Sequence, residues 1–186
     1  MGKVYDEYWN TLLPTFMDRV SYVMKKSMTE AVKGYGITSA HVIYLIALKL
    51  QDGQTIVELS RFLDMDNTNT NRVMKVLKEK GYVTDDRASA TSKKYHYYLT
   101  DMGNAIAEHA MEHFEVTINT PFGALSLEER LQLRNILLKI ISSLDPDFQS
   151  YMESKYTNPF YTYLGFLPPE GSPEAKIAMS KRAGKK

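Results

Sequence analysis

The chain of 186 residues contains no cysteine and only one tryptophan. The absence of cysteine excludes disulfides, thiolate nucleophiles and cysteine-based redox sensing, and it suits a reducing compartment. The longest apolar run, residues 42–48, is far too short to span a bilayer. The opening stretch MGKVYDEYW lacks the apolar core of a secretory signal. We therefore expect a cytoplasmic protein without a membrane partner.

Motifs of common enzyme classes are also missing from the sequence. It has no glycine-rich phosphate-binding loop and only four histidines. The two closest histidines, His109 and His113, have no obvious nucleophile beside them. We therefore expect that the chain is not an enzyme. Its net charge of +1 gives no partner preference, so any such preference must come from local patches.

Apolar residues that recur at steps of three and four predict six helices. Two of these helices start with a capping box, Thr55 with Glu58 and Ser126 with Glu129, in which each residue satisfies a free backbone N–H of the first turn. We expect Pro121 and Gly123 to break the fifth helix. The predicted ranges are about 5–33, 38–51, 55–64, 66–80, 101–119 and 126–144.

The periodicity changes between the fourth and fifth helices. Residues 82–84 and 93–99 favour strands, and the polar segment 85–92 favours a turn, so the pair predicts a β-hairpin. The order of a helix, a short capped helix, a polar turn, a basic helix and a hairpin is that of a helix-turn-helix with a wing. The predicted class is mainly α with a small β-hairpin wing (α+β).

The fourth helix opens with the unusual run DNTNTN, residues 66–71. Asn and Thr are mediocre helix formers, so their use here needs a reason. Asn pairs bidentately with adenine, Thr contacts thymine methyls or phosphates, and Arg binds guanine or phosphate. Residues 67–96 contain seven basic and three acidic residues, a net charge of +4 in a chain of net charge +1. The pattern predicts double-stranded DNA binding. The candidate contacts are Asn67, Thr68, Asn69, Thr70, Asn71, Arg72, Lys75, Arg87, Lys93 and Lys94.

Residues 5–144 resemble the MarR family of winged helix-turn-helix transcriptional regulators. The resemblance rests on the order and spacing of Ile37-Thr38, TIVELSRFLDMDNTNTNRVMKVLKEKGYV (55–83), YYLTDMG (97–103) and LSLEER (125–130). It implies a homodimer that reads a palindromic operator, usually as a repressor released by a small ligand. The implied parts are an N-terminal dimerisation helix (1–36), a DNA-binding lobe (37–100), C-terminal dimerisation helices (101–145) and a tail (146–186).

The wing departs from the family pattern. Many members carry an Asp-x-Arg pair there, in which the Asp orients the Arg for the minor groove. Counted back from Leu99 and Thr100, the equivalent residues are Thr91 and Lys93. Lysine is a less well organised donor than arginine. Arg87 and Lys94 lie close by in the sequence, so a basic wing tip is still expected.

Three further hypotheses concern control. The family resemblance implies an effector site between the dimer helices and the lobe, for which Trp9, Phe16, Tyr35 and Tyr44 are the candidate aromatic residues. A zinc site is the alternative, because His109 and His113 share one helix face. The full candidate metal set is His109, His113, Glu108 and His41. The aromatic half of the tail is expected to pack on the protein, where it fills or covers an effector site, and the basic half to be mobile.

Two other readings remain open at this point. One is a winged-helix architectural protein with little sequence preference and no ligand. The other is a winged module that binds a protein partner. Loss of DNA binding in an Arg72→Ala variant would distinguish a DNA-binding protein from a module that binds a protein partner.

Overall fold

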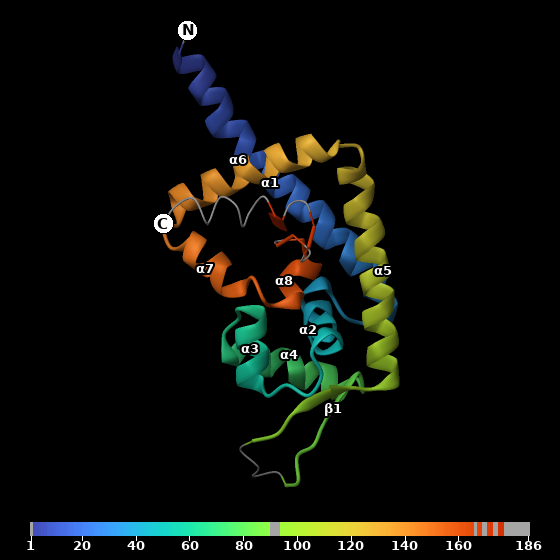
Figure 1. Cartoon of the computed structure of the whole chain (residues 1–186). Coiled ribbons are helices and arrows are strands. Elements are labelled where there is room, and N and C mark those ends of the chain that lie inside the picture. The colour runs from blue at the N-terminus through green and yellow to red at the C-terminus, as the bar shows by residue number, and fades with distance from the viewer. Residues whose placement is uncertain (1, 90–93, 166, 169–170, 173–174, 177–186) are drawn as a thin grey trace.

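The structure is a computed structural model that describes residues 2–89, 94–165, 167–168, 171–172 and 175–176. For residues 2–11, 115, 117–123 and 149 it describes the backbone alone. The elements in chain order are α1 (Gly2–Val32), the 3-10 helix η1 (Lys33–Tyr35), α2 (Ser39–Leu50), α3 (Ile56–Leu63), α4 (Asn67–Glu79), β1 (Val83–Asp85), β2 (Tyr97–Leu99), α5 (Asp101–Gly123), α6 (Leu127–Leu144), α7 (Phe148–Lys155) and α8 (Pro159–Tyr163). Figure 1 shows α3, α4 and the hairpin at one end of the molecule and α6 at the other, with α5 running along one side between the hairpin and α6. This arrangement confirms the predicted mainly α fold with a small hairpin wing.

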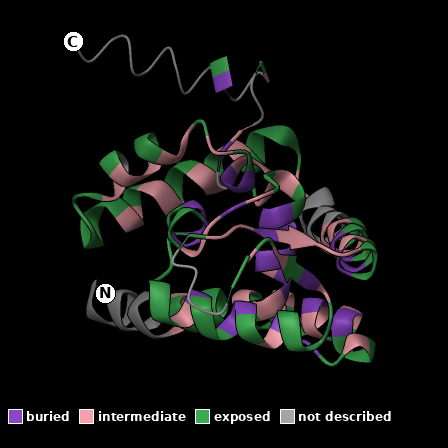
Figure 2. Cartoon of the chain, turned by 90° about the horizontal axis from the view of Figure 1, so that it is seen from below, coloured by how far each residue is buried: buried purple, intermediate pink, exposed green. Residues whose placement is uncertain are grey.

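The core of the protein lies around α2. This helix packs against α1, α3, α4, α5, α8 and β2, and six of its twelve residues are buried. The broad apolar face that the sequence shows in residues 42–48 accounts for this central position, because such a face can be covered only from several sides. The buried residues gather where the helices meet in Figure 2. No single helix among the described residues is both long and apolar enough to cross a membrane, whereas Leu12–Tyr35 and Ser39–Leu50, bent by 80°, pass that test together.

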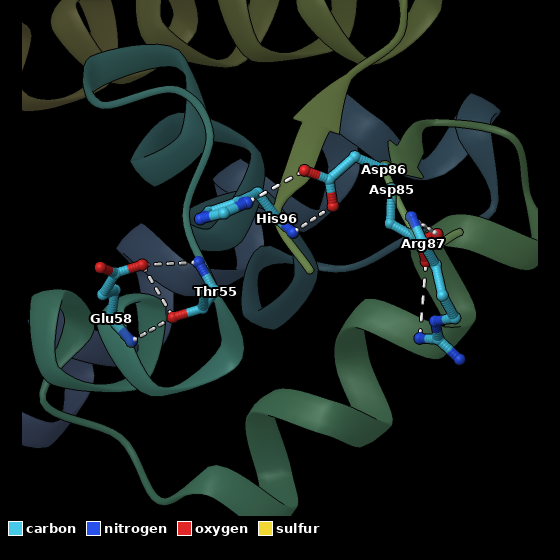
Figure 3. Close-up of polar contacts among 6 residues, drawn as sticks. All are labelled: Thr55, Glu58, Asp85, Asp86, Arg87 and His96. Carbon is cyan, nitrogen blue, oxygen red and sulfur yellow. Dashed lines mark hydrogen bonds and ion pairs between the residues drawn. The ribbon is translucent and has the colours of Figure 1, made fainter. Parts of the chain in front are cut away.

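The predicted helix starts are confirmed by their hydrogen bonds. The Thr55 hydroxyl oxygen accepts from the Glu58 N–H at 3.3 Å, and the Glu58 carboxylate accepts from the Thr55 N–H at 2.9 Å (Figure 3). Ser126 and Glu129 form the same box at the start of α6. The capping spacing thus fixes where α3 and α6 begin.

Contrary to expectation, the fifth helix does not break at Pro121 but continues to Gly123, the second of the two residues expected to end it. Proline interrupts a helix chiefly by lacking an N–H and by crowding the carbonyl four residues earlier. Here only two residues of the helix follow it, so one backbone hydrogen bond is lost and no long segment is displaced. The expectation that the aromatic half of the tail packs on the protein is confirmed, since this half forms the two helices α7 and α8, and Phe160, Tyr161 and Leu167 are buried.

The hairpin is short and is joined by a third segment. Val83 pairs with Leu99, Thr84 with Tyr98 and Asp85 with Tyr97, so β2 covers only the end of the predicted strand 93–99. On its other side, Tyr97 forms an antiparallel bridge with Gln54, and its N–H donates to the Gln54 carbonyl at 2.9 Å. The wing is therefore attached to the segment that leads into α3. This bridge is not among the features predicted from the sequence.

Candidate nucleic-acid interface

The start of α4 presents a row of polar side chains to solvent. The turn from α3 ends at Asp66, whose carboxylate accepts from the Asn69 N–H at 2.7 Å and so caps the helix. Asp64 in that turn has a positive φ of 57°, a conformation that non-glycine residues adopt rarely but Asp tolerates. The cap compensates for the weak helix propensity of the residues that follow. Four predicted contact residues lie exposed on this first part of the helix: Asn67, Thr68, Asn71 and Arg72.

Thr70 is not one of these exposed residues, so its prediction as a DNA contact is wrong. Its side chain is fully buried and its hydroxyl lies 3.4 Å from the Tyr44 hydroxyl. Thr70 precedes Val73, Met74 and Leu77 by three, four and seven residues, and those three residues anchor α4 in the core. Helical spacing places Thr70 on the same inward face. A signal for its burial was therefore present in the sequence.

Asn69 links this buried face to the exposed one. Its side-chain nitrogen donates to the Tyr44 hydroxyl at 3.3 Å, and its side-chain oxygen accepts from the Arg72 guanidinium at 2.9 Å. A hydrogen-bonded Asn is held with its two ends assigned, and the Arg beside it loses some of its side-chain freedom before any ligand arrives. The geometry therefore preorganises Asn69 and Arg72 on the exposed edge of α4.

The basic residues farther along α4 differ in how much they are engaged. Lys75 is exposed and lies 3.9 Å from Glu79, an exposed i, i+4 pair of little energetic weight. Lys78 instead lies 2.6 Å from Asp85 at the base of the wing. Lys75 thus remains available to an anion on the exposed side, whereas Lys78 joins α4 to the hairpin.

The base of the wing contains an ordered arginine. The carboxylate of Asp85 is almost fully buried and lies 3.5 Å from the Arg87 guanidinium, which stacks on the Tyr95 ring at 3.8 Å (Figure 3 shows the pair Asp85–Arg87). Aspartate and stacking together fix the plane of the guanidinium. An Asp-x-Arg pair is therefore present, but at residues 85 and 87. The family positions Thr91 and Lys93 lie outside the described residues, and so does the predicted contact of Lys93.

A second contact closes the hairpin on the other side. Asp86 accepts from the His96 N–H at 2.7 Å and lies 3.0 Å from the His96 ring, as Figure 3 shows. These hydrogen bonds, that of the His96 backbone first, lower the pKa of the Asp86 carboxyl. Lys94, a predicted contact, is exposed two residues earlier. The spacing of Asp85, Arg87 and Tyr95 was visible in the sequence, but only the strand register shows that they meet.

The three predicted effector residues whose side chains the structure describes do not surround one cavity. Tyr44 is buried and faces α4, and Phe16 is 57% exposed on α1. Tyr35 packs edge-on against His109, at 6.3 Å between ring centres, and the side chain of Trp9 lies outside the described part. The prediction that Tyr44 lines an effector site is therefore wrong, because its buried hydroxyl contacts α4 instead. A cavity of about 460 Å³ lies elsewhere, lined by Tyr156, Thr157, Pro159, Thr162, Tyr163 and Pro168.

The predicted metal set is also dispersed. His113 lies 3.0 Å from the Ser27 hydroxyl, and His109 lies 3.2 Å from the Ala31 carbonyl. Glu108 forms an ion pair with Lys49 at 2.7 Å, which lowers its pKa. His41 lies at the start of α2, where its ring binds the Thr38 backbone and hydroxyl. Within the described ranges no three His, Cys, Asp or Glu residues gather as a metal site would require, so the proposed grouping is wrong.

The comparison with known proteins begins with the lobe itself. Residues 35–92, which span η1 to the hairpin, match the model of the MarR family. The transcriptional repressor MprA of Escherichia coli strain K12 is 25% identical over 140 residues, which cover 74% of this chain and 80% of MprA. The winged lobe therefore matches the MarR family. Members of this family are transcriptional regulators rather than enzymes.

Solved structures of MarR-family proteins share the fold. The S. aureus MepR–DNA complex has a TM-score of 0.60 at 23% identity and covers 70% of this chain and 94% of MepR. A MarR protein from Peptoclostridium difficile has a TM-score of 0.62 at 19% identity, with coverages of 75% and 91%. The two matches leave 30% and 25% of this chain uncovered.

Proposed function

We propose that this chain is a homodimeric, sequence-specific DNA-binding regulator of the MarR family that acts as a transcriptional repressor in the cytoplasm. The observation that carries the proposal is the capped start of α4, where Asn67, Thr68, Asn71 and Arg72 are exposed while Val73 and its neighbours anchor the helix. A recognition helix needs this combination, because its N-terminal side chains must reach base edges in the major groove. The exposed N-terminus of the helix also favours a phosphate.

The wing supplies the second contact of the proposal. Arg87 is held by Asp85 and Tyr95, so it reaches a phosphate or the minor groove without first losing its side-chain freedom. Lys94 and Lys75 add exposed positive charge on the same lobe. The MepR structure in complex with DNA supports this use of the fold, because MepR shares the arrangement of lobe and flanking helices.

Self-association is proposed from the exposed apolar faces of the flanking helices. No residue of α6 is buried. Its apolar residues Ile136 and Leu144 are 55% and 81% exposed. A strip of apolar side chains on α1 is similarly open, and in Figure 1 α6 crosses α1. An exposed apolar surface of this extent marks a protein interface. A second copy of the chain is the proposed occupant, since a two-fold axis would place two copies of α4 on a palindrome. The exposed strip on α1 comprises Phe16, Met17, Val20, Tyr22 and Val23.

Repression and release by a small molecule complete the proposal. The resemblance to the repressor MprA supports repression. For the effector, the support is the family resemblance alone, because the predicted aromatic residues whose side chains the structure describes do not meet around one cavity. We carry no zinc response forward, since the four predicted ligands have other partners in the described structure.

Fluorescence anisotropy on the duplex upstream of the gene for this chain tests the proposal. The wild type is titrated at several salt concentrations against that duplex and against random DNA, beside Asn71→Ala and Arg72→Ala. Loss of a base contact is expected to cost about 1–3 kcal/mol on the operator, and log Kd is expected to vary linearly with log salt. Lys33→Ala, which removes one exposed charge from η1, is the control. If no genomic fragment bound more tightly than random DNA, the proposal of sequence-specific binding would be overturned.

A further inference from the structure

The chain after α6 turns back and crosses to the DNA-binding lobe. Figure 1 shows α7 and α8 between α6 on one side and α3 on the other. Asn158, in the link between the two helices, lies 96 residues from the α3 residue that it contacts. This return lies in the tail, beyond the part of the chain that carries the family resemblance. Helices α7 and α8, residues 148–163, are called the brace below.

The polar contacts of the brace converge on the C-terminal end of α3. The Asn158 side-chain amide donates to the Phe62 carbonyl at 3.0 Å. The Lys155 ammonium lies 3.4 Å from the Arg61 carbonyl and 3.5 Å from the Asp64 carboxylate, and its side chain is only 12% exposed. The last carbonyls of a helix have no partner within it, and a cation is favoured there. The chain itself caps α3 through the left-handed Asp64 and the Met65 N–H, which donates to the Ser60 carbonyl at 2.8 Å, and the brace adds donors for the carbonyls of Arg61 and Phe62.

The apolar contacts of the brace reach two parts of the molecule at once. Phe160 is buried, with its ring centre 5.6 Å from that of Phe62 on α3. Tyr163, one helical turn later, lies 5.6 Å from Phe114 on α5. The five-residue helix α8 thus contacts both α3 in the lobe and α5, one of the helices that flank the lobe.

Apart from the brace, α3 has few contacts with α5 and the other flanking helices. Its main packing partners are α2 and α4, both within the lobe, whereas α5 is contacted mainly by α1, α2 and β2. The brace is therefore a direct connection from the end of α3, and from the turn that leads into α4, to α5. Removing it would leave the α3–α4 pair connected to α5 only indirectly, through α2 and the hairpin.

We infer that the brace fixes the orientation of the α3–α4 pair against α5 and thereby sets the separation of the two α4 helices in the dimer. The second half of this inference rests on the proposed DNA-binding function. Half-sites of a palindrome lie about one helical turn apart, roughly 34–36 Å, so a fixed separation selects one spacer length. A looser α3–α4 pair accepts neighbouring spacer lengths at similar affinity.

The absence of cysteine makes a direct distance measurement simple, because two introduced cysteines take spin labels without further changes. Val57 on α3 and Glu112 on α5 are both exposed, so Val57→Cys with Glu112→Cys reports the orientation in question. An excess of unlabelled protein restricts the pulsed-EPR distances to one chain. The test variant combines Lys155→Met with Asn158→Asp.

Asn158→Asp is chosen because it separates two roles. The Asn158 side-chain oxygen caps α8 by accepting from the Phe160 N–H at 2.9 Å, and a carboxylate keeps that cap. The same change removes the donor to the Phe62 carbonyl. Lys176→Met is the matched control, because it removes one positive charge from the tail without touching α3. Circular dichroism verifies that α8 and the rest of the fold persist in both variants.

We expect one narrow distance distribution in the parent and in the Lys176→Met control, and a broader or shifted distribution in the double variant. On operators lengthened or shortened by a single base pair, the parent loses about tenfold or more in affinity, and the double variant loses several-fold less. Superimposable distance distributions in a folded double variant would overturn the brace. Absence of DNA binding by the parent would overturn the proposed function alone, since the distance measurement needs no DNA.

Discussion

The hydroxyl of Tyr44, buried in α2, lies 3.3 Å from the side-chain nitrogen of Asn69 at the exposed start of α4. The same hydroxyl lies 3.4 Å from the buried Thr70 hydroxyl. Tyr44 is thus the point at which the rigid core meets the residues proposed to read bases. Its position suggests that the core, and not the exposed surface alone, controls how Asn69 and Arg72 are presented.

Tyr44→Phe should weaken operator discrimination while leaving the fold intact. The change removes one hydroxyl and frees the Asn69 amide to rotate, at a cost of about 0.5–1.5 kcal/mol for a single hydrogen bond. We expect operator affinity to fall by that amount and affinity for random DNA to stay constant, measured by anisotropy. Tyr35→Phe, which removes a hydroxyl with no described contact to α4, is the control. Equal losses on operator and random DNA would argue against a positioning role for Tyr44.

Asp85→Asn should destabilise the protein more than Asp86→Asn, although the two residues are adjacent. The Asp85 side chain is only 4% exposed and faces both Lys78 and Arg87, whereas the Asp86 side chain is 44% exposed. Neutralising Asp85 leaves two cations facing each other at the base of the wing, with an expected cost of about 1–3 kcal/mol. Urea denaturation measures both variants. Similar midpoints for the two would show that the Asp85 contacts contribute little.

Val20→Glu should convert the dimer to a monomer. Val20 is 51% exposed within the apolar strip of α1, and a charge placed in the centre of an interface is desolvated without a partner. Val57→Glu is the matched control, because Val57 is 55% exposed on α3, outside that strip. Sedimentation equilibrium distinguishes the two states by mass. A wild type that sediments as a monomer, or a Val20→Glu variant that remains dimeric, would remove α1 from the proposed interface.

The elements that the sequence predicted well are those with local causes. The capping pairs at Thr55 and Ser126 and the apolar spacing of 56–63, 67–79 and 127–144 lie within a few residues of one another, so they can be read along the chain. Thr70 shows the limit of such local patterns. Its residue type is typical of a DNA contact, whereas its position in the helix places it on the buried face.

What the sequence did not predict depends on contacts between distant segments. The amide of Asn158 and the carbonyl of Phe62 are 96 residues apart, and nothing local marks them as partners. The stacking of Arg87 on Tyr95 depends on the hairpin register, which shifts every side chain to the other face when it slips by one residue. The aromatic type of Tyr44 does not distinguish a ligand site from a core, because aromatic side chains line pockets and fill cores alike.

His41 should make the stability of α2 depend on pH. Burial, followed by the charges of Lys80 and Arg72, lowers the His41 pKa below its ordinary value of 6.5. The unfolded chain therefore binds more protons than the folded one just below pH 6.5, and stability falls as the pH falls through that value. The protonated ring can no longer accept from the Thr38 N–H, which it does at 3.3 Å. The expected loss is at most about 1 kcal/mol, because the ring is partly exposed.

His41→Gln supplies the comparison for this prediction. Glutamine at the third position of a helix completes a capping box with Thr38 and does not titrate. Thermal melts between pH 7.5 and pH 5.5 should therefore show the wild type losing stability relative to His41→Gln as the pH decreases. Parallel curves for the two proteins would mean that the cap contributes nothing that protonation can remove.

Gly103 lies where the first turn of α5 meets the start of the wing. A Cβ built on it would overlap the backbone carbonyl of Tyr82, which accepts from the Thr100 N–H at 3.1 Å. Gly103→Ala must therefore push α5 away from Tyr82, with an expected cost of about 3 kcal/mol, at the upper end of overpacking penalties. Gly34→Ala is the control, since a Cβ there meets no atom within 4 Å and should change stability by about 0.5 kcal/mol at most. Urea denaturation compares the two alanine variants, and a Gly103→Ala protein as stable as Gly34→Ala would show that α5 and the hairpin are not in this close contact. Because α5 also carries Phe114, the partner of Tyr163 in the brace, the same displacement should broaden the Val57–Glu112 distance distribution.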